Sequence, residues 1–142
     1  MLDLIKTLSL VQDFCEKNRN ILIAYLFGSY ADGTAHQRSD LDLAFLFNEP
    51  VDLRTEMALQ VKLSEVTGIE AIDLLNLNKA PLYLQFKVIT TGRLIYEVDP
   101  DQTSDFLENL FNRYHDREFR YKMFFKEWDE GLKEDYSDGQ SR

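Results

Sequence analysis

The sequence predicts an α/β (α+β) fold: a small mixed β-sheet flanked by helices, followed by a long C-terminal helix. Two segments of strand length, 21–27 and 39–47, indicate strands because they are rich in apolar and β-forming residues. Apolar and aromatic residues recur at helical spacing from 100 to about 131, which indicates one long helix. The 142 residues suffice for one core, so we expect a single domain at 1–133 and a flexible polar tail at 134–142.

The N-terminal part begins with a helix and two strands. A helix is expected over 2–18, where apolar residues recur at helical spacing. The run Ile21–Phe27 stops at Gly28-Ser29 and is typical of a central strand buried on both faces, and a loop is expected after it. The next strand, 39–47, has two different faces. One face carries Leu41, Leu43, Phe45 and Phe47, and the other carries Asp40, Asp42, Ala44 and Leu46.

A second helix and a third strand follow. Asp52 opens the helix and Gly68 ends it, since glycine suits a left-handed cap. Its apolar positions predict a buried stripe made of Leu53, Met57, Val61 and Ser64. The third strand begins near Ala71 and contains Asp73.

The remaining elements are predicted mainly from their boundaries. Pro81 begins a short helix that runs to Ile89. Arg93–Glu97 is expected to be a short strand at or near an edge of the sheet. Asp99-Pro100 pairs a capping side chain with a proline at the first position of the long C-terminal helix.

Composition excludes several classes of function. A net charge of −9 and a pI near 4.7 argue against direct nucleic-acid binding, which depends on clustered Lys and Arg. Cys15 is the only cysteine, so no intramolecular disulfide forms, and a cytoplasmic location fits. No stretch approaches the ~18 apolar residues that a membrane span needs, so no membrane association is expected.

The residues that indicate chemistry lie between Gly28 and Asp73. Ten residues separate Ser29 from Asp40. A strand that ends in Gly28-Ser29 can present the serine hydroxyl and nearby backbone N–H groups to a phosphate. Asp40 and Asp42 share a strand face with β-carbons roughly 6–7 Å apart, which suits two Mg²⁺ ions. Asp73, on a neighbouring strand, is a candidate third ligand and a base for the attacking hydroxyl.

These motifs resemble a known superfamily. Gly28-Ser29, the ten-residue gap and Asp40-x-Asp42 look like the signature of polymerase-β-like nucleotidyltransferases. The short chain resembles their minimal nucleotidyltransferase (MNT) branch, and within it the antitoxins of HEPN/MNT (type VII) toxin–antitoxin pairs. The resemblance implies a nucleotidyltransferase fold. It also implies an enzyme that uses ATP and Mg²⁺ to transfer AMP to a tyrosine of a partner HEPN ribonuclease, in a hetero-oligomer, and so neutralises that toxin.

The resemblance also assigns roles to single residues. Gly28 and Ser29 match the phosphate-binding pair, Asp40 and Asp42 the metal ligands, and Asp73 the third carboxylate. Asp32 departs from the pattern, because such proteins often carry a basic residue at this position. A carboxylate there repels a triphosphate and predicts weaker nucleotide binding.

Several secondary candidates stay open. Arg38 is a candidate phosphate contact, and Ser39 is a nucleotide-site candidate that also suits ordering the turn before the strand. His36 and His115 suit exposed or structural roles better than chemistry. Basic and aromatic residues interleave over 113–126, which fits a partner interface, RNA binding, or a core helix with a charged outer face.

Two further functions compete with protein AMPylation. Nucleotide transfer to a small hydroxyl compound, as in aminoglycoside-modifying relatives, is less favoured because no second domain is evident to enclose the substrate. A catalytically weakened antitoxin that neutralises its partner by binding alone is favoured by Asp32.

Overall fold

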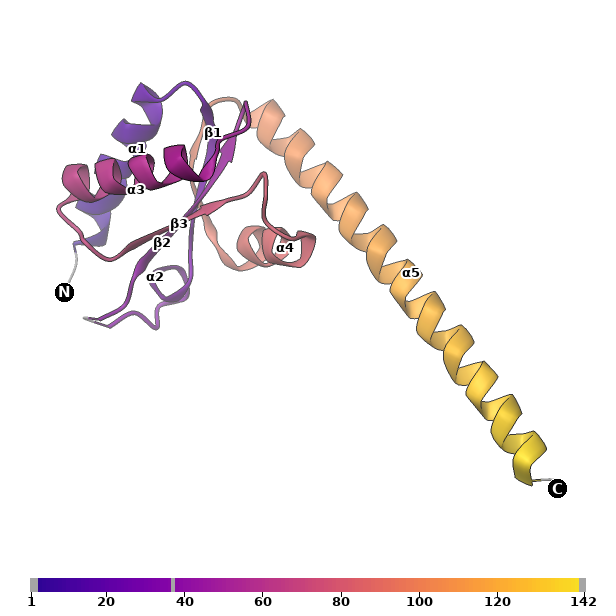
Figure 1. The fold of residues 1–142 in the computed structure, drawn as a ribbon. Coiled ribbons are helices and arrows are strands. Elements are labelled where there is room, and N and C mark those ends of the chain that lie inside the picture. The colour runs from indigo at the N-terminus through magenta and orange to yellow at the C-terminus, as the bar shows by residue number, and fades with distance from the viewer. Residues whose placement is uncertain (1–2, 37, 141–142) are drawn as a thin grey trace.

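The structure is a computed structural model that describes residues 3–36 and 38–140 (Figure 1). Four strands form one sheet, and their bounds are β1 Ile21–Phe27, β2 Leu41–Phe47, β3 Ile72–Asn76 and β4 Arg93–Glu97. The helices are α1 Leu4–Lys17, α2 Ser29–Asp32, α3 Leu53–Thr67, α4 Leu82–Thr91 and α5 Pro100–Gln140. The predicted α/β class is confirmed.

The sheet has the order β3-β2-β1-β4, so β1 and β2 are central and β4 lies at an edge, as expected. β1 pairs antiparallel with both β2 and β4, whereas β2 and β3 run parallel, which makes the sheet mixed. The central strands are almost fully buried because helices cover both faces.

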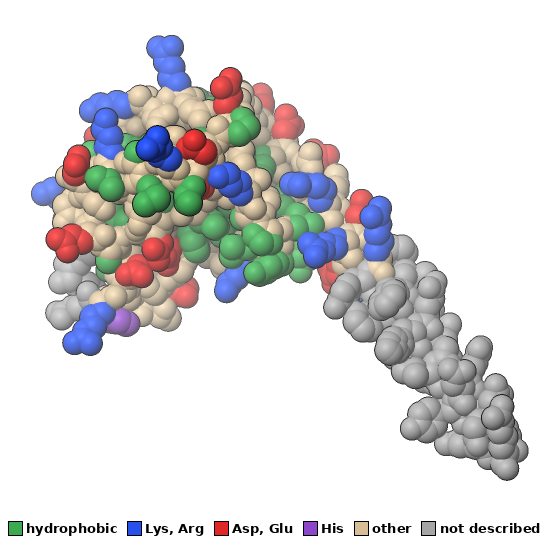
Figure 2. Space-filling model, viewed as in Figure 1, with side chains coloured by type: hydrophobic (Ala, Val, Ile, Leu, Met, Phe, Trp, Pro, Cys, Tyr) green, Lys and Arg blue, Asp and Glu red, His purple; other side chains and the backbone are tan. Residues whose placement is uncertain are grey.

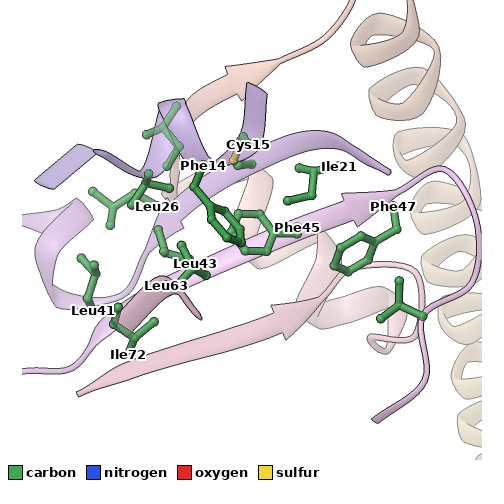
Figure 3. Packing of buried hydrophobic residues seen from close by; sticks show 14 residues of the cluster. Phe14, Cys15, Ile21, Leu26, Leu41, Leu43, Phe45, Phe47, Leu63 and Ile72 are labelled. Carbon is green, nitrogen blue, oxygen red and sulfur yellow. The ribbon is translucent and has the colours of Figure 1, made fainter. Parts of the chain in front are cut away.

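The larger core lies between the sheet and the helices α1 and α3. It contains the predicted inward face of β2 (Leu41, Leu43, Phe45 and Phe47) together with Val11, Phe14 and Cys15 of α1 and Leu63 of α3. Figure 3 shows Phe14 and Phe45 next to each other in this layer. Burial removes each large apolar side chain from water, which stabilises the fold by about 1.5–3 kcal/mol per residue.

The opposite face of the sheet is covered by α4. Val88 of α4 packs with Ile23, Tyr25 and Ala44 of the central strands, and Phe106 at the start of α5 adjoins this cluster. Ala44 belongs to the predicted second face of β2, on which Asp42 also lies. The face that carries the carboxylate is therefore the face that α4 covers.

Helix α3 begins and ends as predicted, but the predicted buried stripe is wrong. The Asp52 carboxylate accepts a hydrogen bond from the Thr55 N–H, and Gly68 ends the helix with φ +73°. Leu53, Met57 and Val61 are 67, 60 and 60% exposed, whereas Leu63 is fully buried. The Gln60 side chain also donates to the Ile72 carbonyl of β3. Apolar residues occur on both sides of α3, and the side that packs against α1 and β3 is the buried one.

Two other segments differ from expectation. The loop expected after β1 begins with the four-residue helix α2. The last helix, α5, continues past Gly131 to Gln140 and is about 60 Å long at 1.5 Å per residue. The expected flexible tail, 134–142, is thus helical as far as Gln140, and 141–142 lie outside the described residues.

The first part of α5 packs on α4, and its C-terminal half leads away from the domain (Figure 1). Phe86 of α4 stacks on Tyr114 with ring centroids 3.8 Å apart and meets Phe111 edge to face at 5.5 Å. The expected aromatic positions farther along α5 lie outside the described side chains: Tyr121, Phe125, Trp128 and Leu132. Within the described residues, no helix has the length and apolar character needed to cross a membrane.

Candidate active site

Three strands bring the predicted residues to one end of the sheet. Phe27, the last residue of β1, pairs with Asp42 near the start of β2. Asp42 in turn lies beside Asp73 in the parallel register of β2 and β3. Gly28 follows directly after Phe27, so the glycine and the two carboxylates lie in a row across neighbouring strands, which are about 4.8 Å apart.

Gly28 lies against the Asp42 carboxylate. A β-carbon at Gly28 would overlap the Asp42 Oδ2 atom and come within 3.1 Å of Cγ. The backbone there has φ +73° and ψ −154°, a conformation essentially restricted to glycine. Glycine is therefore required at this position both for the turn from β1 into α2 and for the close approach of the carboxylate.

The electrostatics of the site centre on Asp42. Partial burial, the neighbouring charges of Asp73 and Asp40, and a hydrogen bond with the Asp73 side chain raise the pKa of Asp42 to about 6. Two carboxylates this close repel each other when both are ionised, so a proton or a cation is needed to neutralise the pair. This requirement is typical of a site that binds a cation.

Asp40 is close enough to contribute to the charge around Asp42, but it lies outside the paired part of β2. It is exposed, directly before β2, and within the described residues no group of three carboxylate, imidazole or thiolate side chains is gathered closely enough to hold a metal ion. Asp42 and Asp73 nevertheless fit Mg²⁺, because this ion prefers oxygen ligands and keeps several waters while taking only one or two protein carboxylates.

A cavity of about 380 Å³ adjoins Gly28, the residue that packs against Asp42. The predicted carboxylates Asp40, Asp42 and Asp73 are not among its lining residues. Gly28 and Ser29 line it from the end of β1 and the start of α2, and Asp32 and Thr34 line it farther along the same segment. Helix α4 forms another wall, with Lys87 and Thr91 among its lining residues. The predicted phosphate-binding pair thus faces a space large enough for a phosphate chain.

Asp32 has a local structural role in this wall. Its carboxylate accepts hydrogen bonds from the Thr34 backbone N–H at 2.9 Å and the Thr34 hydroxyl at 2.5 Å. These bonds lower the pKa of Asp32, so this carboxylate is ionised at neutral pH. Asp32, which stands where a basic residue was expected, therefore places a negative charge in the lining of the cavity.

Two predicted nucleotide-site residues lie outside the cavity lining. The Ser39 hydroxyl accepts a hydrogen bond from the His36 N–H at 2.8 Å and orders the turn before β2. Arg38 is exposed, and its backbone N–H donates to Nδ1 of His36. Conversely, no sequence pattern links Lys87 to the motif, because α4 reaches the cavity only through its packing on the sheet.

Comparison with known proteins identifies the family. The sequence profile described as polymerase beta nucleotidyltransferase matches residues 10–101, which contain the whole sheet and the candidate site. The chain belongs to this nucleotidyltransferase family. The predicted superfamily is thereby confirmed.

Individual relatives include proteins of toxin–antitoxin systems. The protein adenylyltransferase MntA of Shewanella oneidensis is 32% identical over 96 residues, which cover 68% of this chain and 66% of MntA, just under two thirds of its length. One chain of a toxin–antitoxin crystal structure with AMP-PNP is 25% identical with a TM-score of 0.70, covering 89% of this chain and 98% of that one.

A third relative shares the fold. It is a chain from the complex of tri-AMPylated Shewanella oneidensis HEPN toxin with an MNT antitoxin, with 20% identity and a TM-score of 0.68. The match covers 87% of this chain and 96% of that chain. Together with the family profile, these likenesses confirm the predicted nucleotidyltransferase fold.

Proposed function

We propose that this chain is an antitoxin-type protein adenylyltransferase. It transfers AMP from ATP to a tyrosine hydroxyl of a partner HEPN ribonuclease toxin and so neutralises the toxin. The observation that carries the proposal is the packing of Gly28 against Asp42, in register with Asp73, beside a cavity lined by Ser29. The likeness to MntA, a protein adenylyltransferase, supports the reaction, and the likeness to toxin–antitoxin complexes supports the partner.

Each residue has a part in this proposed reaction. The Ser29 hydroxyl donates a hydrogen bond to the triphosphate. The acceptor oxygen attacks the α-phosphorus, the bond from that phosphorus to the bridging oxygen breaks, and pyrophosphate leaves. Asp73 accepts the proton of the attacking hydroxyl, which must lie within about 3 Å of its carboxylate.

The proposed cofactor is Mg²⁺. Its binding can be tested by its effect on the melting temperature of the protein. Asp42 and Asp73 would hold the ion with Asp40 as a further ligand, and bound Mg²⁺ would neutralise charge on the phosphates. Because a ligand that binds only the folded state stabilises it, millimolar MgCl₂ should raise the melting temperature of the wild-type protein. The same addition should leave Asp42→Asn unchanged. Equal shifts in both proteins would contradict the proposed ligand.

The activity is tested with the purified chain, ATP, Mg²⁺ and a HEPN-family toxin as the proposed partner. Intact-mass spectrometry should show added mass in multiples of AMP on the partner. The double variant Asp40→Asn/Asp42→Asn should abolish this modification, whereas the exposed Asp13→Asn of α1 should retain it. Unchanged modification by the double variant would refute the proposal, and pyrophosphate release with small acceptors only would favour a small hydroxyl substrate.

Neutralisation by binding alone is a second candidate, and the Asp32 charge in the cavity favours it. The two candidates differ in cells that express the toxin. If the Asp40→Asn/Asp42→Asn variant still restores growth, contact with the toxin suffices. If only the wild type restores growth, transfer of AMP is required.

We also propose a docking site for the partner at the junction of α4 and α5. A cavity of about 510 Å³ there is lined by Tyr83, Tyr114, Arg117, Glu118 and Lys122. Figure 2 shows hydrophobic side chains gathered over α4 with Lys and Arg side chains next to them on α5. Aromatic and Arg residues are enriched in protein interfaces, which supports the interface reading of 113–126.

A further inference from the structure

The candidate phosphate cavity has an unusual charge pattern on the side of the β1–α2 segment. Asp32 contributes an ionised carboxylate to the lining, and Asp42 and Asp73 lie nearby. A triphosphate carries several negative charges, so this side of the cavity repels it. Positive charge from another wall would offset this repulsion, in addition to the charge that the proposed Mg²⁺ supplies.

Helix α4 supplies that wall. Leu84, Lys87, Val88 and Thr91 line the cavity, and their spacing places them on one face of the helix. Val88 is 1% exposed and is packed in the core against the sheet, so the position of this face is fixed by the fold. Lys87, on the same face, is exposed, so its ammonium group is in contact with solvent.

Both threonine hydroxyls in the cavity lining already donate hydrogen bonds within the protein. The Thr34 hydroxyl donates to Asp32, and the Thr91 hydroxyl donates to the Lys87 carbonyl at 2.6 Å. Within the described part of the chain, the lysines found in ion pairs are Lys79, with Glu56, and Lys122, with Glu118. The Lys87 ammonium is therefore available for a ligand, and it is the cationic side chain of the lining.

We infer that Lys87 binds the triphosphate of the nucleotide and supplies the positive charge that the Asp32 position lacks. The inference rests on the proposed function, since it assigns a further residue to the same nucleotide site. Lys87 would hold the phosphates from the α4 side of the cavity while Ser29 contacts them from the β1–α2 side. Lys87 is a substrate-binding residue in this assignment and accepts no proton.

The test is equilibrium binding of AMP-PNP and adenosine, with Mg²⁺, measured by isothermal titration calorimetry on the full chain. Lys87→Ala should raise the Kd for AMP-PNP by about 10- to 100-fold, the usual loss for one charge-assisted contact. Its Kd for adenosine should change less than about twofold, because adenosine has no phosphate. Lys87→Arg keeps the charge and should retain most of the affinity.

The matched control is Lys62→Ala, which removes the same charge from an exposed lysine of α3, on the opposite face of the sheet. It should bind AMP-PNP like the wild type. Equal Kd values for Lys87→Ala and the wild type would overturn the inference while leaving the proposed function intact. Equal weakening for AMP-PNP and adenosine would also overturn it, because the loss would not concern phosphate. Absence of AMP-PNP binding by the wild type would overturn both proposals.

Discussion

At the scale of single residues, Gly28 is where the fold and the candidate site meet. Gly28→Ala should lower the free energy of unfolding by roughly 3 kcal/mol, because backbone strain adds to the clash with Asp42. Gly33→Ala is the matched control, since Gly33 also has positive φ (+82°) but has open space around it. It should cost about 1–2 kcal/mol from strain alone. Urea unfolding measures both values, and equal losses would contradict the packing of Gly28 on Asp42.

The raised pKa of Asp42 predicts that Asp42→Asn increases the thermal stability of the protein by an amount that depends on pH. Because the folded state raises this pKa from 3.8 to about 6, ionisation of Asp42 destabilises the fold as pH increases from about 4 to 6. At pH 7.5 the asparagine variant should therefore melt at a higher temperature than the wild type, and near pH 4 the difference should vanish. Differential scanning fluorimetry across this range checks it. A gain that is constant with pH would contradict the electrostatic cause.

A substitution at Asp32 can distinguish the effect of its negative charge from the effect of its hydrogen bonds with Thr34. Asp32→Asn keeps an oxygen that can accept the Thr34 hydrogen bonds and removes the negative charge from the cavity. The Kd for AMP-PNP should fall severalfold, since a like charge near the phosphates is lost. Asp13→Asn on α1 controls for the change in net charge. Unchanged affinity in Asp32→Asn would show that the Asp32 charge does not reach the nucleotide.

The sequence could predict the part of the site that depends on strand register. Gly28, Asp42 and Asp73 lie at strand ends, and period-two alternation indicates which strand face each carboxylate occupies. Lys87 could not be predicted, because its place depends on how α4 packs across the sheet. The roles in nucleotide and metal binding stay predictions for all of the candidate residues: Gly28, Ser29, Arg38, Ser39, Asp40, Asp42 and Asp73.

At the scale of elements, Leu53 and Leu63 of α3 provide a comparison with identical chemistry. Leu63→Ala should destabilise the protein by about 2–5 kcal/mol, because Leu63 is fully buried and its truncation leaves a cavity. Leu53→Ala should change stability by less than about 0.5 kcal/mol, since Leu53 is 67% exposed. Chemical denaturation measures both. A larger loss of stability for Leu53→Ala than for Leu63→Ala would support the buried stripe that was expected from the sequence.

This comparison also shows why some elements were predictable and others were not. β1 and β4 have the predicted bounds, because an apolar run or alternation ends at glycine or at charged residues. The buried face of α3 was not predictable, because two sides of this helix carry apolar residues. Leu53, Met57 and Val61 lie on one side, whereas the core contains Leu59 and Leu63 of the other. The helix α2 has four residues, which is too short for any periodic signal.

At the scale of the whole molecule, α5 divides into a packed part and an extended part. Leu110 is fully buried, and Tyr114 stacks on Phe86 of α4. The C-terminal half leads away from the sheet and from the carboxylates (Figure 1). Most of the stability of a helix in a protein comes from packing against other elements, and an isolated helix is only marginally stable in water. We therefore expect the proposed partner to contact this half in addition to the docking site at the junction of α4 and α5.

A chain that ends after Glu118 tests this expectation. It retains the α4–α5 contacts, so its melting temperature and its Kd for AMP-PNP should stay close to those of the full chain. Its affinity for the toxin, measured by biolayer interferometry, should fall by at least tenfold, because an interface that extends along α5 loses most of its area. A matched loss of stability would instead assign the C-terminal half to the fold. Full toxin affinity in a stable truncated chain would confine the interface to the proposed docking site at the junction of α4 and α5, because the truncated chain keeps Tyr83 and Tyr114 and loses only Lys122 of that site.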